Sequence, residues 1–151
     1  IFTPKSLLRH PKVASRIEEL TEGGFQHVID DPIAAANPSQ VGRVLVCSGK
    51  VYYDLKEERA KRYAGSEHEI AIVRVEQQYP FPHAEFKAEI ARYAKAKEVV
   101  WCQEEPQNQG AWYRLRAYLR ADVLDSHVLA YAGRSISAST SIGATGVFST
   151  M

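Results

Sequence analysis

The sequence lacks several features that would place it in a function class on their own. Its 151 residues include only 2 cysteines, which cannot form a disulfide framework. No apolar run approaches the roughly 20 residues needed to cross a membrane, and no secretion signal is recognisable. The formal net charge is +1, so no overall field would attract nucleic acid or a membrane surface. We therefore expect a single domain with a sizeable core and neither nucleic acid nor membrane as partner.

Complete catalytic and nucleotide-binding motifs are also missing. Ser48-Gly49-Lys50 resembles the end of a phosphate loop, but Val44 stands in place of the first glycine and Val51 in place of the Ser or Thr after the lysine. We expect a tight turn there, with a weak anion site at the following helix as the alternative. There is no dinucleotide fingerprint and no serine nucleophile elbow. The 5 histidines do not stand at metal-ligand spacing, so we assign no metal site.

What the sequence does have is a regular alternation of buried strands and amphipathic helices. Continuous apolar runs predict strands at 43–47, 70–75, 98–102 and 127–131, after a short strand at 25–29. Helical spacing follows three of these runs, at 50–63, 83–93 and 109–121. Such alternation with short connections predicts an α/β fold with a mostly parallel sheet and helices on its faces.

The two ends of the chain lack this alternation of strands and helices. We expect residues 1–40 to be a linker with short helical turns, of which 30–40 forms a surface connection, and residues 41–151 to form the domain. Residues 135–150 are small and polar, and predict either a loose tail or a segment that packs on a neighbour. The beginning without Met and the ending at Met151 suggest a piece of something longer.

Some charged and sulfur-containing residues have an ordinary structural explanation. The basic clusters are expected on solvated helix faces; they comprise Lys56, Arg59, Lys61 and Arg62, and Arg114, Arg116 and Arg120. Cys47 and Cys102 each end an apolar run, so we expect buried, reduced thiols.

The most unusual stretch is "WCQEEPQNQGAW" at 101–112, which follows the third main strand. Strand ends of an α/β sheet form a common edge, and ligands collect there. Glu104 and Glu105 are adjacent, so in extended chain they should point apart rather than form an acid–base pair. We expect Asn108 to cap the next helix and the carboxylates to lie before its positive end.

Five motifs in order give the sequence a family resemblance. They are "FTPKSLLRHP", "VCSGKVYYDL", "IAIVRVEQQYPFP", "WCQEEPQNQGAW" and "YAGRSISAS". Together they resemble the C-terminal region of the E1 component of 2-oxoglutarate dehydrogenase complexes, over nearly the whole chain. The resemblance implies a three-layer domain like the C-terminal domain of transketolase, usually with one antiparallel strand. The family continues with a His and a helical tail, whereas this chain has Phe148 at about that place and is truncated.

The resemblance also implies a function for the parent enzyme. Such an enzyme, an oxidoreductase of the tricarboxylic acid cycle, decarboxylates 2-oxoglutarate with thiamine diphosphate and Mg and succinylates the lipoyl group of the E2 component. The cofactor motifs lie upstream in the family, so we assign no catalytic residue and no cofactor to this chain and expect it to be inactive alone. Implied partners are the upstream domains of its own chain, the second subunit of a homodimer and E2. The implied location is the bacterial cytoplasm, or the mitochondrial matrix if the source is eukaryotic.

Three hypotheses for this chain follow. The first is a structural and dimer-forming domain, whose interface or structural residues are Gln103, Glu104, Glu105, Asn108, Gln109 and Gly110. Amides and carboxylates give many donors and acceptors in a short length, and Gly110 permits close approach. The second is a regulatory module for a small anion or nucleotide, using Ser48, Lys50 and Arg134. The third is a small enzyme using Glu104 and Glu105.

Overall fold

A single sheet organises the chain. The computed structural model describes residues 4–123 and 125–138. The strands are β1 (Val28–Ile29), β2 (Arg43–Cys47), β3 (Ile70–Val75), β4 (Glu98–Pro106) and β5 (Val128–Arg134). Their order in the sheet is β1-β3-β2-β4-β5. β2 to β5 run parallel and β1 is antiparallel to β3, so the mostly parallel α/β fold is confirmed.

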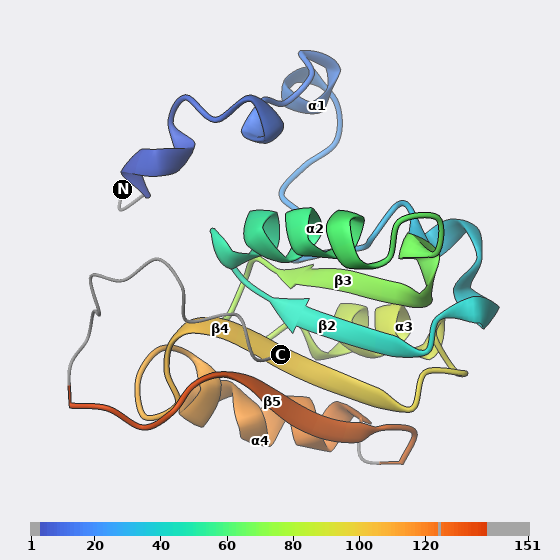
Figure 1. Cartoon of the computed structure of the whole chain (residues 1–151), viewed down its shortest axis with the longest axis vertical. Helices are drawn as coiled ribbons and strands as arrows, with labels where there is room; N and C mark the ends of the chain where they lie inside the picture. The colour runs from blue at the N-terminus through green and yellow to red at the C-terminus, as the bar shows by residue number, and fades with distance from the viewer. Residues whose placement is uncertain (1–3, 124, 139–151) are drawn as a thin grey trace.

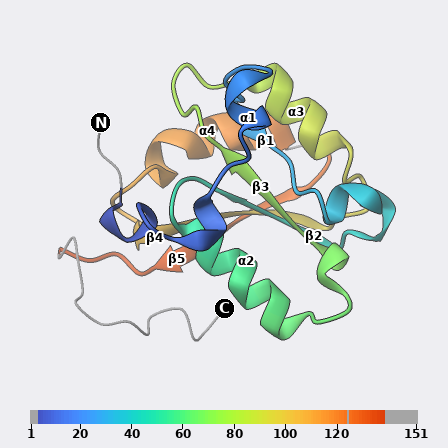
Figure 2. The same ribbon diagram turned by 90° about the horizontal axis from the view of Figure 1, so that it is seen from above.

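Helices cover both faces of the sheet and give three layers. α2 (Val51–Arg62) packs on one face, and α3 (His83–Ala91) and α4 (Trp112–Val123) pack on the other (Figures 1 and 2). The side chains of β2 alternate between the layers: Val44 and Val46 join the core under α3 and α4, while Cys47 joins the core under α2. A strand buried on both faces must be apolar throughout, which is why the apolar runs predicted these strands.

The connections create a switch point beside β2. From β2 the chain passes through α2 to β3 on one side, and then returns to β4 on the other side of β2. Right-handed crossovers in opposite directions must place their helices on opposite faces, as α2 and α3 are here. The connections that leave the carboxyl ends of β2 and β4 therefore run in opposite directions, and such a point is where α/β sheets usually bind ligands.

Several element boundaries differ from those predicted. The short strand is Val28–Ile29 rather than 25–29, and Phe25 is 72% exposed. β4 continues to Pro106, so part of the expected joint is strand. α4 begins at Trp112 and β5 ends at Arg134, each later than expected. Polar residues at these ends carry no apolar periodicity, so the sequence pattern could not place the boundaries.

Two expectations of a solvated position are wrong because of one buried ion pair. Asp31 was expected in a surface connection and Arg59 on a solvated helix face, yet they are 3% and 5% exposed and paired to each other. Val28, Ile29 and Asp31 lie within the packed structure, N-terminal to the boundary expected at residue 41. The remaining cations of both basic clusters are exposed, as predicted.

The N-terminal residues form an arm outside the three layers. It contains isolated helical turns and the one-turn helix α1 (Glu18–Thr21), and it lies beyond α2 (Figure 1). Lys12 and Glu57 join the arm to α2 through an ion pair of 3.4 Å. Residues 139–150, expected as a tail, and Phe148 lie outside the described residues.

Candidate functional site

A polar crevice of about 440 Å³ lies at the switch point between β2 and β4. Its walls come from the turn 48–51 after β2, from 101–105 in β4, and from Gly110, Ala111 and Arg114 around the start of α4. Pro4 and Gln78 complete the lining. The common edge of strand ends, where the sequence analysis expects ligands to collect, is therefore hollowed at the point where the strand order reverses.

Lys50 and Glu104 form an ion pair across this crevice. The ammonium Nζ of Lys50 lies 2.7 Å from Oε1 of Glu104 and 3.1 Å from Oδ2 of Asp54. The hydrogen bond to Glu104 is the main cause that raises the pKa of Lys50. Gly49 makes the tight turn before it with φ of +72°, which glycine adopts without strain. The pair links the β2–α2 turn to β4 and neutralises the cation that an anion site would need.

Gln103 organises the connection between β4 and α4. Its side chain is buried, and its Oε1 accepts from Nε1–H of Trp101 and from the backbone N–H of Trp112, both at 3.0 Å. Its Nε2 donates to the carbonyl oxygens of Pro106 at 3.1 Å and Gln109 at 2.8 Å. One buried amide thus closes the joint and supplies an acceptor to the first turn of α4.

The expected helix cap at Asn108 is wrong. Asn108 instead pairs with the backbone of Ser137: its Nδ2 donates to the carbonyl at 3.0 Å and its Oδ1 accepts from the N–H at 3.1 Å. Gln109 also donates to that carbonyl, at 3.2 Å. These two amides therefore hold the segment that follows β5, while Gln103, nine residues before Trp112, takes the capping role.

Gly110 is required by packing within the joint itself. Its φ is +66°, and a Cβ there would lie 3.0 Å from Nε2 of Gln103 and 3.0 Å from Oε2 of Glu105. Gly133 in β5 has a similar role, because a Cβ would lie 2.9 Å from the carbonyl oxygen of Gln103. The sequence pattern indicated the first of these glycines and missed the second.

The two adjacent carboxylates face different neighbours. Glu104 is bound to Lys50 at the start of α2, and Glu105 is exposed beside Gly110 before α4. Among residues 4–123 and 125–138, the carboxylate of Glu105 has no hydrogen-bond or ion-pair partner. This arrangement does not join the two groups as an acid–base pair, and it leaves one carboxylate available at the surface.

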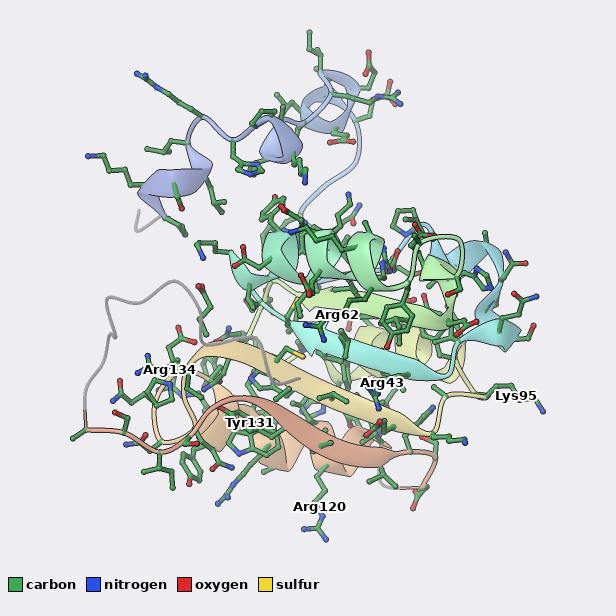
Figure 3. The ribbon with its side chains drawn as sticks, in the orientation of Figure 1. Arg43, Arg62, Lys95, Arg120, Tyr131 and Arg134 are labelled. Carbon is green, nitrogen blue, oxygen red and sulfur yellow. The ribbon has the colours of Figure 1, made fainter. Side chains whose placement is uncertain are left out.

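The three residues proposed for an anion site do not all meet. Ser48 and Lys50 line the crevice, but Arg134, at the end of β5, is not among its lining residues. Nε and Nη2 of Arg134 are buried without a hydrogen-bond partner in the described part of the chain. Figure 3 shows Arg134 and Tyr131 on the β5 side of the sheet.

Chemistry that depends on thiolates or metals finds little support in the described residues. Cys47 and Cys102 are both buried and unbridged, as expected, and burial raises the pKa of Cys102 to about 12. Within the described ranges no three His, Cys, Asp or Glu side chains are grouped to hold a metal ion. No helix in that part of the chain is long and apolar enough to span a membrane.

A family model, 2-oxoglutarate dehydrogenase C-terminal, matches residues 14–150. The chain belongs to this family. It is 48% identical over 143 residues to the 2-oxoglutarate dehydrogenase E1 component of Cupriavidus necator, covering 95% of this chain and 15% of that protein. It is 49% identical over 142 residues to the E1 component of Haemophilus influenzae, covering 94% and 15%. The E1 component of Azotobacter vinelandii is 48% identical over 146 residues, with the same coverage of 94% and 15%.

The family match is confined to a small part of each relative. The chain spans about 15% of the length of these curated relatives. The C-terminal 2-oxoglutarate dehydrogenase domain described here therefore has the family that its five motifs indicated. The crevice, the Gln103 joint and the exposed Glu105 are features of that domain, which spans a small share of an E1 component.

Proposed function

We propose that this chain is the non-catalytic C-terminal part of a 2-oxoglutarate dehydrogenase E1 subunit, and that it stabilises the subunit's homodimer. The observation that carries the proposal is the set of contacts made by residues 103–110, the joint between β4 and α4. Its amides hold the β4–α4 connection and the segment after β5, and Glu104 is held by Lys50. Glu105 alone of this group presents a carboxylate at the surface that has no partner in the described part of the chain. A rigid polar corner with one available carboxylate suits docking onto a neighbouring surface better than it suits catalysis.

The parent enzyme's chemistry is part of the same proposal. The parent would decarboxylate 2-oxoglutarate with thiamine diphosphate and a divalent metal, and would pass the succinyl group to the lipoyl arm of E2. Among the described residues no three carboxylates, imidazoles or thiols are grouped to hold a metal ion. The proposal places cofactor binding in parts of the parent outside this chain, and we derive no catalytic step here.

The partners and location follow from this assignment. The chain would contact upstream domains of its own subunit and the second E1 subunit, and the assembled E1 would meet E2. The similar E1 components reported above come from bacteria, which favours a bacterial cytoplasm as the location.

The test uses full-length E1 with Glu104→Ala and Glu105→Ala combined. We expect the dimer dissociation constant to rise by about tenfold, because removing a carboxylate that is paired across a buried interface leaves its partner charge unpaired. Turnover at protein concentrations that keep the dimer intact should change less than about twofold. The control is Glu69→Ala with Asp125→Ala, which removes two exposed carboxylates outside both the 103–110 joint and the N-terminal arm. An unchanged dimer dissociation constant in the first variant would refute the proposal.

The crevice favours a second candidate function, a regulatory site for a small anion or nucleotide. Ser48, Gly49 and Lys50 line it at the switch point, where such folds bind ligands. A bound anion would have to displace Glu104 from Lys50. A thermal-shift screen with nucleotides, coenzyme A and 2-oxoglutarate tests this, with Lys50→Met as the matched variant. An increase in the unfolding temperature that Lys50→Met abolishes supports the site. If none of the three kinds of ligand raises the unfolding temperature, the site is contradicted.

A further inference from the structure

The exposed face of α4 carries positive charge that the described chain does not neutralise. We call it the arginine face, and its residues are Tyr113, Arg114, Arg116, Ala117, Arg120 and Ala121. None of the three arginines has an acidic partner among the described residues; the guanidinium of Arg116 lies over the ring of Tyr113 at 4.7 Å. Figure 3 shows Arg120 projecting away from the body of the molecule. Two small alanines one turn apart lie among these long side chains.

The arginines stand at positions where their charge does not stabilise α4 itself. The first turn of α4 contains Arg114 and no acidic residue, although helix N-termini favour negative charge. Arg116 and Arg120 are also like charges one turn apart, which destabilises a helix. The cations of α2 are arranged differently: Lys61 pairs with Glu57 at 2.9 Å, and Arg62 pairs with Glu58. The contrast between the two helices indicates that the arginine face meets an acidic surface outside its own helix.

A group of acidic residues lies at the other end of the molecule (Figure 1). α1 and its flanking residues carry Glu18, Glu19 and Glu22. Within the described ranges only Glu18 of these three has a partner, Arg16 at 3.3 Å. Ile17 and Leu20, one helical turn apart, are 74% and 78% exposed. A helix as short as α1 is not stable in water without a surface to pack on. We call residues 16–22 the acidic arm.

The acidic arm cannot reach the arginine face of its own chain in this structure. Figure 1 shows α1 and α4 at opposite ends of the long axis, with the sheet and α2 between them. The arm is held on the α2 side by the ion pair of Lys12 with Glu57 and by the contact of His10 with Tyr53, whose ring centroids are 6.0 Å apart. The arginine face of the same chain therefore does not cover the arm's glutamates, Ile17 or Leu20.

We propose that the acidic arm of one copy of this chain docks on the arginine face of α4 in a second copy, in a reciprocal two-fold contact. Glu19 and Glu22 pair with the arginines of the partner copy, and Ile17 and Leu20 cover its alanines. A two-fold contact uses both surfaces of both copies and closes the assembly. The contact rests on the assembly role proposed above, because it requires a second copy beside the first. Arginine and tyrosine are the residues that such interfaces favour.

Other polyanions fit this face less well. Three arginines are fewer than the six to ten phosphate contacts of a typical DNA-binding surface, and the net charge of the chain is only +1. The acidic arm also has exposed apolar side chains that a contact with the arginine face would bury, and a nucleic acid backbone has none. Binding of a DNA duplex that competes with self-association would contradict the proposal.

The test exploits the reciprocity of the contact. One variant combines Arg116→Glu with Arg120→Glu, and the other combines Glu19→Arg with Glu22→Arg. Each variant alone places like charges at both contacts of a dimer, so we expect its association constant, measured by sedimentation equilibrium of the 151-residue chain at low salt, to fall by about tenfold or more. An equimolar mixture of the two variants has complementary charges at both contacts. It should associate within about threefold of the unchanged protein.

Control variants separate this contact from other effects. Lys95→Glu with Lys97→Glu makes the same charge change on exposed lysines that lie outside both surfaces (Figure 3 shows Lys95 pointing into solvent), and should leave association within about twofold. Circular dichroism confirms that each variant is folded. A monomeric unchanged chain, unaffected association in the variants, or a mixture that fails to associate would each overturn the proposal. Those results would leave the full-length dimer test of Glu104 and Glu105 unaffected, so the two proposals fail separately.

Discussion

Asp31 and Arg59 form an ion pair that is almost completely buried, although 28 residues separate them in the chain. The pair joins the segment after β1 to α2. Arg59 also donates to the carbonyl of Ile70 at 2.8 Å, and the N–H of Ile72 donates to Asp31 at 2.9 Å. The network therefore fixes α2 and the segment after β1 to the start of β3.

Asp31→Ala should destabilise the protein strongly. It leaves the guanidinium of Arg59 buried without a counter-charge, which costs about 3–5 kcal/mol. Replacing both partners, as Asp31→Leu with Arg59→Met, should cost less than the single change for the same reason. Urea unfolding measures both. The control Glu58→Ala removes an exposed pair with Arg62 and should cost about 0.5 kcal/mol or less. Equal losses for Asp31→Ala and Glu58→Ala would contradict the buried-network account.

Gln103→Ala should loosen the joint between β4 and α4. It leaves the indole N–H of Trp101 and the backbone N–H of Trp112 without their acceptor, and each buried unpaired group costs about 1–3 kcal/mol. Thermal unfolding measures the loss, and faster amide hydrogen exchange at Trp112 localises it. Gln26→Ala, at an exposed position, is the matched control and should be neutral. An unchanged exchange rate at Trp112 would rule out the capping role.

Glu89 should make stability fall as the pH rises. Burial, followed by its hydrogen bond to Asp30, raises the pKa of Glu89 to about 7, above its usual 4.5. A raised carboxyl pKa means that the folded state holds the proton more tightly, so this stabilisation is complete below about pH 4.5 and is lost as the pH rises through 7. Glu89→Gln should therefore gain stability over the unchanged protein between pH 5 and pH 8, by about 1 kcal/mol after solvent screening.

The matched comparison for Glu89 is Glu85, on the same helix, where the effect has the opposite sign. A backbone hydrogen bond and then His27 lower the pKa of Glu85. Its contribution is present above its unfolded-state pKa and is lost as the pH falls, so Glu85→Gln should lose stability at neutral pH. Urea unfolding at several pH values measures both variants. Parallel pH profiles for Glu89→Gln and the unchanged protein would refute the assignment.

Gly110→Ala should cost more than Gly49→Ala. Both glycines have positive φ, of +66° and +72°, so both changes carry the strain of a left-handed conformation, about 1–2 kcal/mol. Only at Gly110 would the added Cβ also press on Gln103 and Glu105, at 3.0 Å, whereas nothing lies within 4 Å at Gly49. Chemical denaturation of the two variants compares them directly. A larger loss of unfolding free energy for Gly49→Ala would show that the residues around Gly110 move aside at little cost.

Part of the candidate site was predictable from the motif at 101–112. Its polar residues follow a buried strand, so they had to lie at the carboxyl edge of the sheet. The role of Gln103 was missed, although one signal was present: in extended chain it lies on the same face as Trp101, which is buried. A buried glutamine must satisfy its amide within the protein, and its partners lie up to nine residues away along the chain.

The sequence by itself determined the layers of this protein, because apolar runs and helical spacing record which residues must leave water. It also determined the family, through five motifs in a fixed order. The tertiary structure alone decided which charges are buried together, as with Asp31 and Arg59. It also decided which have no acidic partner among the described residues, as with the arginines of α4. The physical reason is that local sequence patterns indicate which side chains become buried. The partner of a charge or an amide is instead the group nearest to it in space. The order of the strands in the sheet sets that proximity, and local patterns do not predict it.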